Sequence, residues 1–289
     1  DNLSNKALII NESTSFPGTL RELIAPIISR NTSIEHFYAA SPERVDPGNP
    51  VWNQNNTPRL IAGLTEEATK KAVDFYSKFC SNVVRVSTPE VAEAAKLFEN
   101  TFRQVNIAMV NEFAQISHGL GIDVREVLDA AATKPFGFMK FSPGLGVGGH
   151  CIPVDPSYLS FAAEKVGIDA SFIDLANEIN LNMPSYVANR ISNEIGGLLG
   201  KKVLVAGLSY KANIADLRES PSLLLINALE GLGAAVIKHD PLIAGAEPIS
   251  ACDVAILAVA HEAIDKDMLR KCAPYVFDCT GTLSGVHGL

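Results

Sequence analysis

The sequence has no run of 18 or more apolar residues, so no segment is long enough to cross a bilayer as a helix. Its first residues, DNLSNKALII, lack the basic region and cleavage site of a secretory signal peptide. No cluster of basic residues occurs, and the formal net charge is -8, which disfavours nucleic acids and acidic membranes as main partners. We therefore expect a cytoplasmic protein whose partners include neither nucleic acid nor a membrane.

The five cysteines show no CxxC spacing and no clustered histidines, so the sequence indicates neither a disulfide framework nor a zinc site. Four of them lie in apolar surroundings and are expected to be small core residues: Cys80, Cys252, Cys272 and Cys279. Cys151 differs because glycines, His150 and Asp155 surround it.

A chain of 289 residues is long enough for about two domains, and 47% apolar with 19% charged residues is typical of a globular protein. Residues 1–87 alternate between apolar strand-like runs and helical patterns, which predicts a parallel sheet covered by helices. The expected strands lie in KALIINEST, FYAASPER, RLIAG and VVRVS, and the expected helices in FPGTLRELIAPII and TEEATKKAVDFYSKF.

A long helix is predicted from Thr88 and Pro89, a cap and first-turn pair, to Gly119. Its length of roughly 45 Å exceeds one small domain, so we expect it to join two domains and to offer apolar surface to a partner subunit. Residues 88–200 are expected to be mainly helical, with further helices in DVREVLDAAAT, PSYLSFAAEKVG and PSYVANRISNEIGGLLG.

The alternation of strands and helices returns in residues 201–289, where Ser220 and Pro221 mark the start of a helix. The predicted fold class is therefore α/β, with two Rossmann-like parallel-sheet domains joined by a long central helix. The segment before KALIINEST contains no strand, glycine loop and helix, so the N-terminal domain is expected to be incomplete in this chain.

The segment GLGVGGHCIPVDP, residues 144–156, contains G-x-G-x-x-G spacing but has no strand before it and a proline after it. A dinucleotide-binding loop needs a strand and an opening helix, so the match is judged accidental. The glycine-rich turn instead presents Cys151, whose thiolate would be favoured by exposed main-chain N–H groups. Asp155 could act as a base or orient water. A structural cysteine in a turn remains an alternative.

Lys96 and Asn100 are four residues apart on the long helix, so both side chains lie on one face and could stabilise an oxyanion. A solvated helix face would explain them equally. Thr14, close to Glu12 at a strand end, and Glu43 in SPERVDPG lie where α/β sheets bind ligands, although turn and capping roles are also possible.

Lys211 and Arg218 bracket the turn between the first strand and first helix of residues 201–289. With the helix N-terminus they could form a phosphate site, while solvated surface cations are the alternative.

Five segments together, in this order, resemble the UDP-glucose/GDP-mannose dehydrogenase family: NESTSFPGT, SPERVDPGN, AAKLFENTF, GVGGHCIPVDP and GLSYKANIADLRES. The resemblance implies NAD-dependent oxidation of a sugar C6 alcohol to a carboxylate with two NAD consumed. SPERVDPGN and ATKPFGF look most like the branch that acts on UDP-N-acetylhexosamines. Separately, the apolar surface of the central helix indicates a homodimer formed through that helix.

The resemblance assigns roles to individual residues. Cys151 matches the nucleophile that forms a thiohemiacetal and then a thioester, and Lys96 and Asn100 match the pair that stabilises oxyanions. Asp155 and Thr14 match groups that orient or activate water, and Glu43 matches a carboxylate of thioester hydrolysis. The matches for binding the UDP-sugar are Gly148, Gly149, Tyr210 and Lys211. Thr14, Glu43 and Arg218 match residues near the cofactor, and Lys134 matches a residue that reaches a neighbouring subunit's site.

Three departures from the family pattern affect the expected activity. The strand, glycine-rich loop and helix that bind NAD are missing, so this chain alone is expected to bind NAD weakly and to be inactive. Val154 stands where some relatives have a lysine directed at the cofactor, and Thr280 stands where many have an arginine.

Two other functions are compatible with the residues. The chain could be a non-catalytic, dimeric module that binds a UDP-sugar. It could also be a cysteine hydrolase that uses Cys151 with His118 or His261, although no acyl-transfer motif surrounds the cysteine.

Overall fold

The computed structural model describes residues 6–46 and 48–289. Residues 1–5, which belong to the N-terminal stretch expected to lack a signal peptide, and Pro47 of SPERVDPGN lie outside the described residues. Two compact units are present: unit 1 comprises the chain up to Phe102 with Val154–Ser171, and unit 2 comprises Arg103–Pro153 with Phe172–Leu289. Within the described ranges, no helix combines the length and apolarity needed to cross a membrane.

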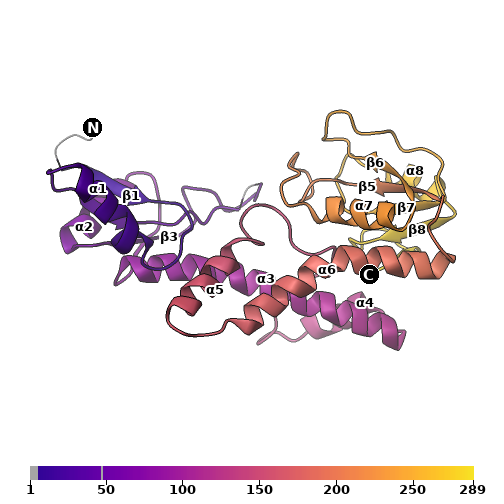
Figure 1. Ribbon diagram of the computed structural model, residues 1–289, viewed down its shortest axis with the longest axis horizontal. Helices are drawn as coiled ribbons and strands as arrows, with labels where there is room; N and C mark the ends of the chain where they lie inside the picture. The colour runs from indigo at the N-terminus through magenta and orange to yellow at the C-terminus, as the bar shows by residue number, and fades with distance from the viewer. Residues whose placement is uncertain (1–5, 47) are drawn as a thin grey trace. The chain divides into compact units, whose positions relative to one another are not determined.

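Unit 1 contains a sheet of four strands in sequence order, shown in indigo and purple in Figure 1. The pairs β1–β2 and β3–β4 are parallel, whereas β2 and β3 are antiparallel. This last pairing departs from the all-parallel sheet expected, because the described residues between β2 and β3 (41–46 and 48–58) contain no crossover helix to carry the chain back. The strands are β1 (Leu8–Asn11), β2 (Phe37–Ala40), β3 (Arg59–Gly63) and β4 (Val83–Arg85).

Helices cover both faces of this sheet. Successive residues of β2 point to opposite faces, and each set packs against different helices. Tyr38 and Ala40 pack in one apolar cluster with Leu20, and Ala39 packs in another with Tyr76. The Thr65 hydroxyl caps α2 by accepting a hydrogen bond from the Ala68 N–H at 3.1 Å. The covering helices are the π-helical turn η1 (Leu20–Ile24), α1 (Ala25–Asn31) and α2 (Glu66–Tyr76).

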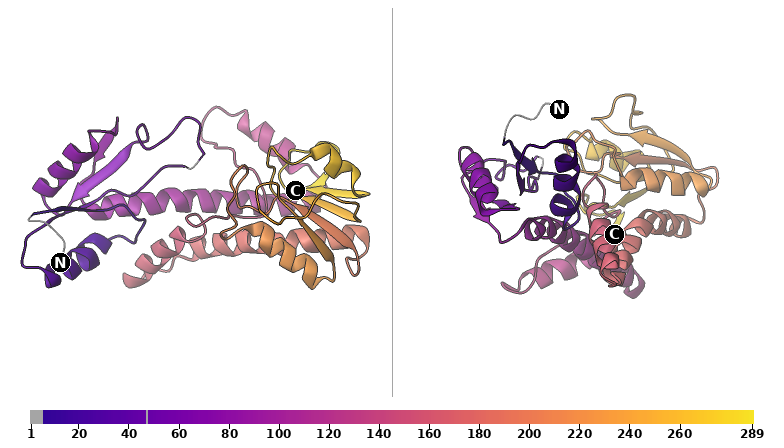
Figure 2. Two further views of the ribbon diagram at one scale, coloured as in Figure 1. Left: turned by 90° about the horizontal axis from the view of Figure 1, so that it is seen from above. Right: turned by 60° about the vertical axis from the view of Figure 1, so that its left-hand side comes forward.

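The predicted long helix is confirmed as α3 (Pro89–Leu120), which has 32 residues. It begins where the sequence indicates, with the Thr88 hydroxyl accepting from the Val91 N–H at 3.3 Å. The other central helices are α4 (Val124–Ala132), α5 (Asp155–Lys165) and α6 (Ser171–Ile195). In unit 2, α6 runs alongside the second part of α3, as Figures 1 and 2 show.

The helix expected in PSYVANRISNEIGGLLG is confirmed up to Ile195, but it extends further toward the N-terminus, since Pro184 lies inside α6. A proline removes one helical hydrogen bond, so it more often marks a helix start. Here the helix continues on both sides because Met183, Val187 and Ile191 are fully buried in one apolar cluster.

Unit 2 contains a five-stranded parallel sheet of order β6-β5-β7-β8-β9. Helices lie on both faces: Val203 and Val205 of β5 pack with residues of α6 and α7, while Leu204 packs with residues near α8. Its elements are β5 (Lys202–Ala206), α7 (Pro221–Gly231), β6 (Ala235–His239), β7 (Val254–Leu257), α8 (Lys266–Lys271), β8 (Tyr275–Asp278) and β9 (His287–Gly288). Only β9 was not anticipated from the sequence.

Candidate functional site

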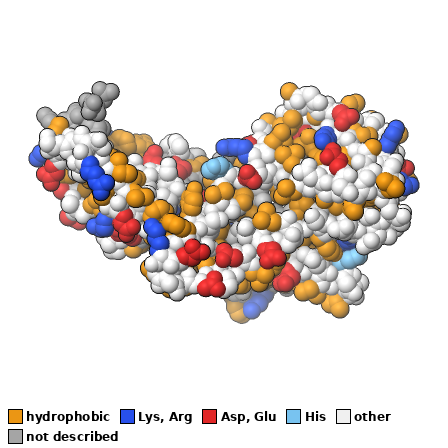
Figure 3. All heavy atoms as spheres, in the orientation of Figure 1, with side chains coloured by type: hydrophobic (Ala, Val, Ile, Leu, Met, Phe, Trp, Pro, Cys, Tyr) orange, Lys and Arg blue, Asp and Glu red, His pale blue; other side chains and the backbone are white. Residues whose placement is uncertain are grey.

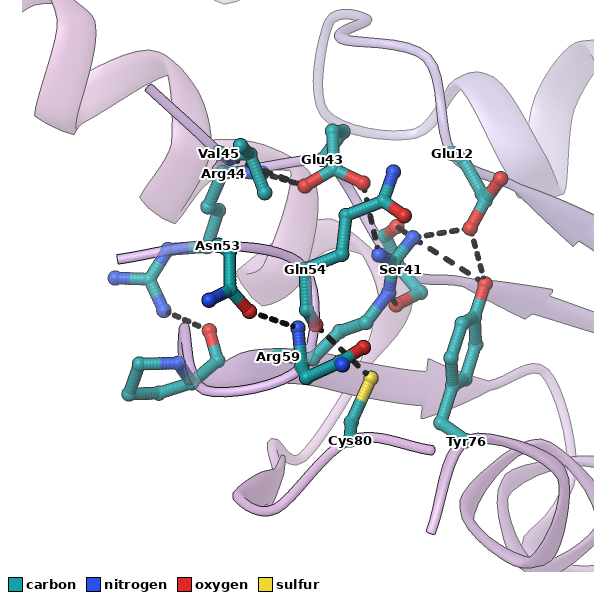
Figure 4. A network of polar contacts seen from close by, with 12 residues as sticks. Glu12, Ser41, Glu43, Arg44, Val45, Asn53, Gln54, Arg59, Tyr76 and Cys80 are labelled. Carbon is teal, nitrogen blue, oxygen red and sulfur yellow. Dashed lines mark hydrogen bonds and ion pairs between the residues drawn. The ribbon is translucent and has the colours of Figure 1, made fainter. Parts of the chain in front are cut away.

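The sheet of unit 1 ends in a polar network centred on Arg59 (Figure 4). The Arg59 guanidinium is almost fully buried and donates to the Glu43 carboxylate at 2.9 Å and to the Ser41 hydroxyl at 2.9 Å. It also pairs with Glu12, whose carboxylate accepts from the Tyr76 hydroxyl at 2.5 Å. The two acidic residues after β1 and β2 are therefore held at one edge by a single cation.

Glu43 is fixed as an ionised acceptor by this network. One carboxylate oxygen accepts from the main-chain N–H groups of Arg44 and Val45 at 2.8 and 3.0 Å. Burial acts to raise the pKa of Glu43, but these main-chain donors and the Arg59 guanidinium outweigh it and hold the pKa below its usual value. A deprotonated carboxylate in this place can orient water.

Thr14 lies in the loop that follows β1 and is half-buried. The end of this loop is anchored to α3, because the buried Glu93 carboxylate accepts from the N–H groups of Gly18 and Leu20 at 2.7 and 3.0 Å. Burial raises the pKa of Glu93 above its usual value. The N–H groups of Gly18, before η1, and of Leu20, its first residue, are thus bonded to a carboxylate of the same unit.

Asn100 and Asp155 are brought together as predicted for two groups of one site. The Asn100 amide donates to the Asp155 carboxylate at 2.5 Å, and both side chains are buried. Lys96 lies one turn earlier on the same face of α3 and is half-buried. The amide fixes the carboxylate, which can then accept a proton or orient water.

In unit 2, the glycine-rich segment of Cys151 is tied to α3 and α6. The Gly144 N–H donates to the Asn111 side chain at 2.9 Å, and the Asn111 amide donates to Asn180 at 2.9 Å. Asn180 also lies one helical turn before Pro184, so its carbonyl lacks the usual helical donor. A Cβ on Gly146 would collide with this carbonyl, so only glycine allows the approach.

The glycines before Cys151 pack directly on Tyr210, as expected for a turn and a residue of one binding site. A Cβ on Gly148 would lie 2.9 Å from the Tyr210 Cβ, and one on Gly149 would lie 2.8 Å from its ring. The Gly149 N–H donates to the Arg218 carbonyl at 3.1 Å. Cys151 follows this contact as an exposed free thiol, whereas Cys80 and Cys279 are buried as predicted.

Tyr210 and Lys211 line a cavity of about 280 Å³ at the carboxyl edge of the unit 2 sheet. Thr280 also lines it, although its own hydroxyl and N–H are bonded to Asp278 at 2.7 and 2.6 Å. The remaining lining includes Gly144–Gly146, Pro221, Ser222 and Ala258–Ala260.

Two predicted cations are not among the described residues that line this cavity. Arg218 is bonded to Asp216 at 2.6 Å, and Lys134 lies over the Phe136 ring at 5.0 Å from its centroid. The first N–H groups of α7 are also engaged, because Ser222 and Leu223 donate to Ser220 at 3.3 and 3.1 Å. The phosphate site expected around Lys211 and Arg218 thus retains only Lys211 at the cavity.

His261 does not fit the alternative of a cysteine hydrolase. Its ring is fully buried, with Nδ1 accepting from the Asn213 N–H at 2.9 Å and Nε2 facing Asp240 at 3.1 Å. Both nitrogens are therefore engaged, and neither is available to a thiol.

Sequence reasoning missed Arg59, Glu93, Asn111, Asn180 and the pair of Asp240 and His261. A possible signal was a polar residue within an otherwise apolar strand or helix face, because a buried polar side chain needs a partner.

Comparisons with known proteins place all three parts of the chain in one family. Residues 1–80 match the NAD binding domain of the UDP-glucose/GDP-mannose dehydrogenase family, residues 90–182 its central domain, and residues 204–285 its UDP binding domain.

Individual relatives agree with this assignment. Protein CapL of Staphylococcus aureus is 39% identical over 242 residues, which cover 81% of this chain and 57% of that protein. UDP-N-acetyl-D-glucosamine 6-dehydrogenase of Pseudomonas aeruginosa is 35% identical, covering 88% of this chain and 65% of that protein. The chain thus spans about three fifths of these relatives' length.

A solved structure of UDP-D-ManNAc dehydrogenase from Pyrococcus horikoshii superposes with a TM-score of 0.87 at 30% identity. The match covers 99% of this chain and 73% of that one. The chain therefore belongs to the UDP-glucose/GDP-mannose dehydrogenase family.

Proposed function

We propose that this chain carries the nucleophile and substrate site of an NAD-dependent UDP-sugar 6-dehydrogenase. The reaction is the four-electron oxidation of the C6 hydroxyl to a carboxylate. The observation that carries the proposal is the exposed Cys151 thiol, which is separated only by His150 from glycines packed on Tyr210. Tyr210 lines the cavity in the domain that matches UDP binding.

The proposed substrate is a UDP-N-acetylhexosamine. Two relatives of similar length coverage carry names for such substrates, with N-acetylglucosamine in one and N-acetylmannosamine in the other. The resemblance of SPERVDPGN and ATKPFGF to that branch supports the same class.

In the proposed mechanism, NAD when bound would supply the hydride acceptor for each of two oxidations at C6. The first oxidation gives an aldehyde and releases the hydroxyl proton. The Cys151 sulfur then bonds to C6, and its proton is transferred so that a thiohemiacetal forms. Loss of the second hydride and a proton leaves a thioester, and water cleaves the C–S bond to give the carboxylate and the free thiol.

The family resemblance assigns these further steps to polar groups of the chain. The Lys96 ammonium and Asn100 amide stabilise the negative charge on the C6 oxygen. Asp155, held by Asn100, orients or deprotonates water together with Thr14, and the ionised Glu43 assists thioester hydrolysis. Covalent attachment keeps the aldehyde in place between the two oxidations.

The donor set of unit 1 fits the hydroxyl-rich part of a dinucleotide. Carboxylates of Glu12 and Glu43 and the Thr14 hydroxyl follow the parallel strands β1 and β2, where α/β sheets bind ligands. The start of η1 does not fit a pyrophosphate, because the N–H groups of Gly18 and Leu20 are bonded to Glu93.

We also propose a homodimer formed through α3. Apolar side chains remain exposed along this helix at spacings of four and seven residues: Val91, Phe98, Phe102, Met109, Ile116 and Leu120. Figure 3 shows, in orange, the hydrophobic side chains on the side of the molecule that faces the viewer. Light scattering should give twice the mass of 30.9 kDa, and a Phe98→Glu variant should shift it to the monomer. An unchanged dimer would contradict the assignment of this face.

The activity is tested with this protein, NAD and a UDP-N-acetylhexosamine. Two NADH should form per UDP-N-acetylhexosamine, and Cys151→Ser should block uronic acid formation by about a thousandfold or more. A Cys252→Ser variant is the matched control and should retain activity. Full turnover by the Cys151 variant would refute the thioester step, and UDP binding without any turnover would favour the non-catalytic module.

A further inference from the structure

A fully buried carboxylate ends β6 and binds the loop that follows β5. One oxygen of Asp240 accepts from the N–H groups of Leu208 and Ser209 at 2.7 and 3.1 Å, and from the Ser209 hydroxyl at 3.2 Å. Its other oxygen accepts from the Leu242 N–H at 2.9 Å. Asp240 thus fixes the start of the segment that carries Tyr210 and Lys211.

His261 extends the same anchor to the other end of that segment. Its Nε2 lies 3.1 Å from the Asp240 oxygen that holds Ser209, and its Nδ1 accepts from the Asn213 N–H at 2.9 Å. These two bonds require the neutral tautomer with hydrogen on Nε2. One pair of side chains therefore fixes both Ser209 and Asn213.

Asn213 itself adopts an unfavourable backbone conformation, with φ of 62°. A residue other than glycine keeps this conformation only where its surroundings impose it. Besides the His261 contact, the Asn213 side chain accepts from the Glu262 N–H at 2.9 Å. The loop end is thus held against its own backbone preference by the segment after β7.

We infer that Asp240 and His261 are positioning residues that hold Tyr210 and Lys211 in the shape that accepts the UDP part of the substrate. The inference rests on the proposed function. Between the two anchored ends lie Tyr210, Lys211 and Ala212, which all line the cavity, and Tyr210 also supports the glycines before Cys151. Neither Asp240 nor His261 is solvent-accessible, so both act through the loop.

Two substitutions separate the two bonds of the ring. His261→Gln retains a donor toward Asp240, and His261→Asn retains an acceptor toward Asn213. Titration of this chain with UDP should show affinity reduced about tenfold in each variant, since each loses one hydrogen bond of the anchor. His239→Gln is the control, because the His239 ring contacts the Glu247 carbonyl at 2.7 Å and no part of the loop. Its affinity should be unchanged.

Protection of Cys151 from iodoacetamide by UDP provides a second measurement. UDP should slow labelling in the parent chain and in the His239 variant, and should protect the His261 variants only at correspondingly higher concentration. Thermal melting identifies the folded fraction, to which the affinities are referred. Affinities within twofold of the parent value in both folded His261 variants would overturn the positioning role.

If the His261 variants do not fold, two milder substitutions of Asn213 test the same inference. Asn213→Gly accepts the positive φ and keeps the N–H bonded to His261, so UDP affinity should fall less than threefold. Asn213→Ala loses the Glu262 contact, as the glycine variant does, but keeps the backbone strain, and should therefore weaken UDP binding more than the glycine variant. Equal affinities in both would overturn the inference. Failure of the parent chain to bind UDP would instead overturn the proposed UDP site.

Discussion

The two sheets of the molecule organise their carboxyl edges in different ways. In unit 1, Arg59 holds the carboxylates of Glu12 and Glu43, whose side chains remain 54% and 40% exposed. In unit 2, Asp240 and His261 are both fully buried and bond mainly to main-chain groups. The first edge thus presents charged side chains to a ligand, whereas the second shapes the backbone around a cavity.

The largest expected effect on stability comes from removing Arg59 at the carboxyl edge of the unit 1 sheet. Arg59→Met should lower the free energy of unfolding of unit 1 by about 3 kcal/mol, because it leaves two carboxylates and a buried tyrosine hydroxyl without their cation. Hydrogen exchange of unit 1 amides measures this loss.

The matched control is Arg85→Met, which removes a cation that is 51% exposed and paired with Glu66. A surface pair of this kind contributes less than about 1 kcal/mol. Equal losses in the two variants would show that the Arg59 network is no stronger than a surface ion pair.

A smaller effect is expected at the glycine turn of unit 2. Gly149→Ala should cost about 2 kcal/mol of stability and weaken UDP binding, because φ is 83° and the new Cβ would press on the Tyr210 ring. Gly144→Ala is the control, since a Cβ there meets nothing within 4 Å. Calorimetric unfolding and UDP titration of both variants measure the difference. Equal stabilities and equal UDP affinities of the two variants would contradict the importance of the packing of this turn on Tyr210.

The smallest expected effect is the pH dependence contributed by Glu43. Its folded-state pKa is lowered, so its stabilisation is present above the ordinary value of 4.5 and is lost as pH falls through the folded pKa. The stability difference between pH 7 and pH 3 should therefore be smaller in Glu43→Gln, by less than about 1 kcal/mol because the group is partly exposed. Glu164→Gln, which alters an exposed carboxylate, should leave the difference unchanged. An identical pH profile in both variants would contradict the lowered pKa.

The antiparallel pairing of β2 and β3 explains why the Arg59 network escaped prediction. Ala40 faces Ala62 in this register, and continuing it places Arg59 opposite Glu43. In the parallel sheet expected from the sequence, the first residue of a strand would lie at the opposite edge from Glu43. A reversal of one strand thus brought a cation to the acidic residues.

The sequence alone determined the long helix, the strands other than β9, and the family, because apolar periodicity, helix caps and ordered motifs are local properties. Tertiary structure decided which partner each polar group has. Asn100 meets Asp155, 55 positions away, and His261 meets Asp240, 21 positions away. It also decided that α6 continues through Pro184, because burial of its apolar face outweighs one lost hydrogen bond.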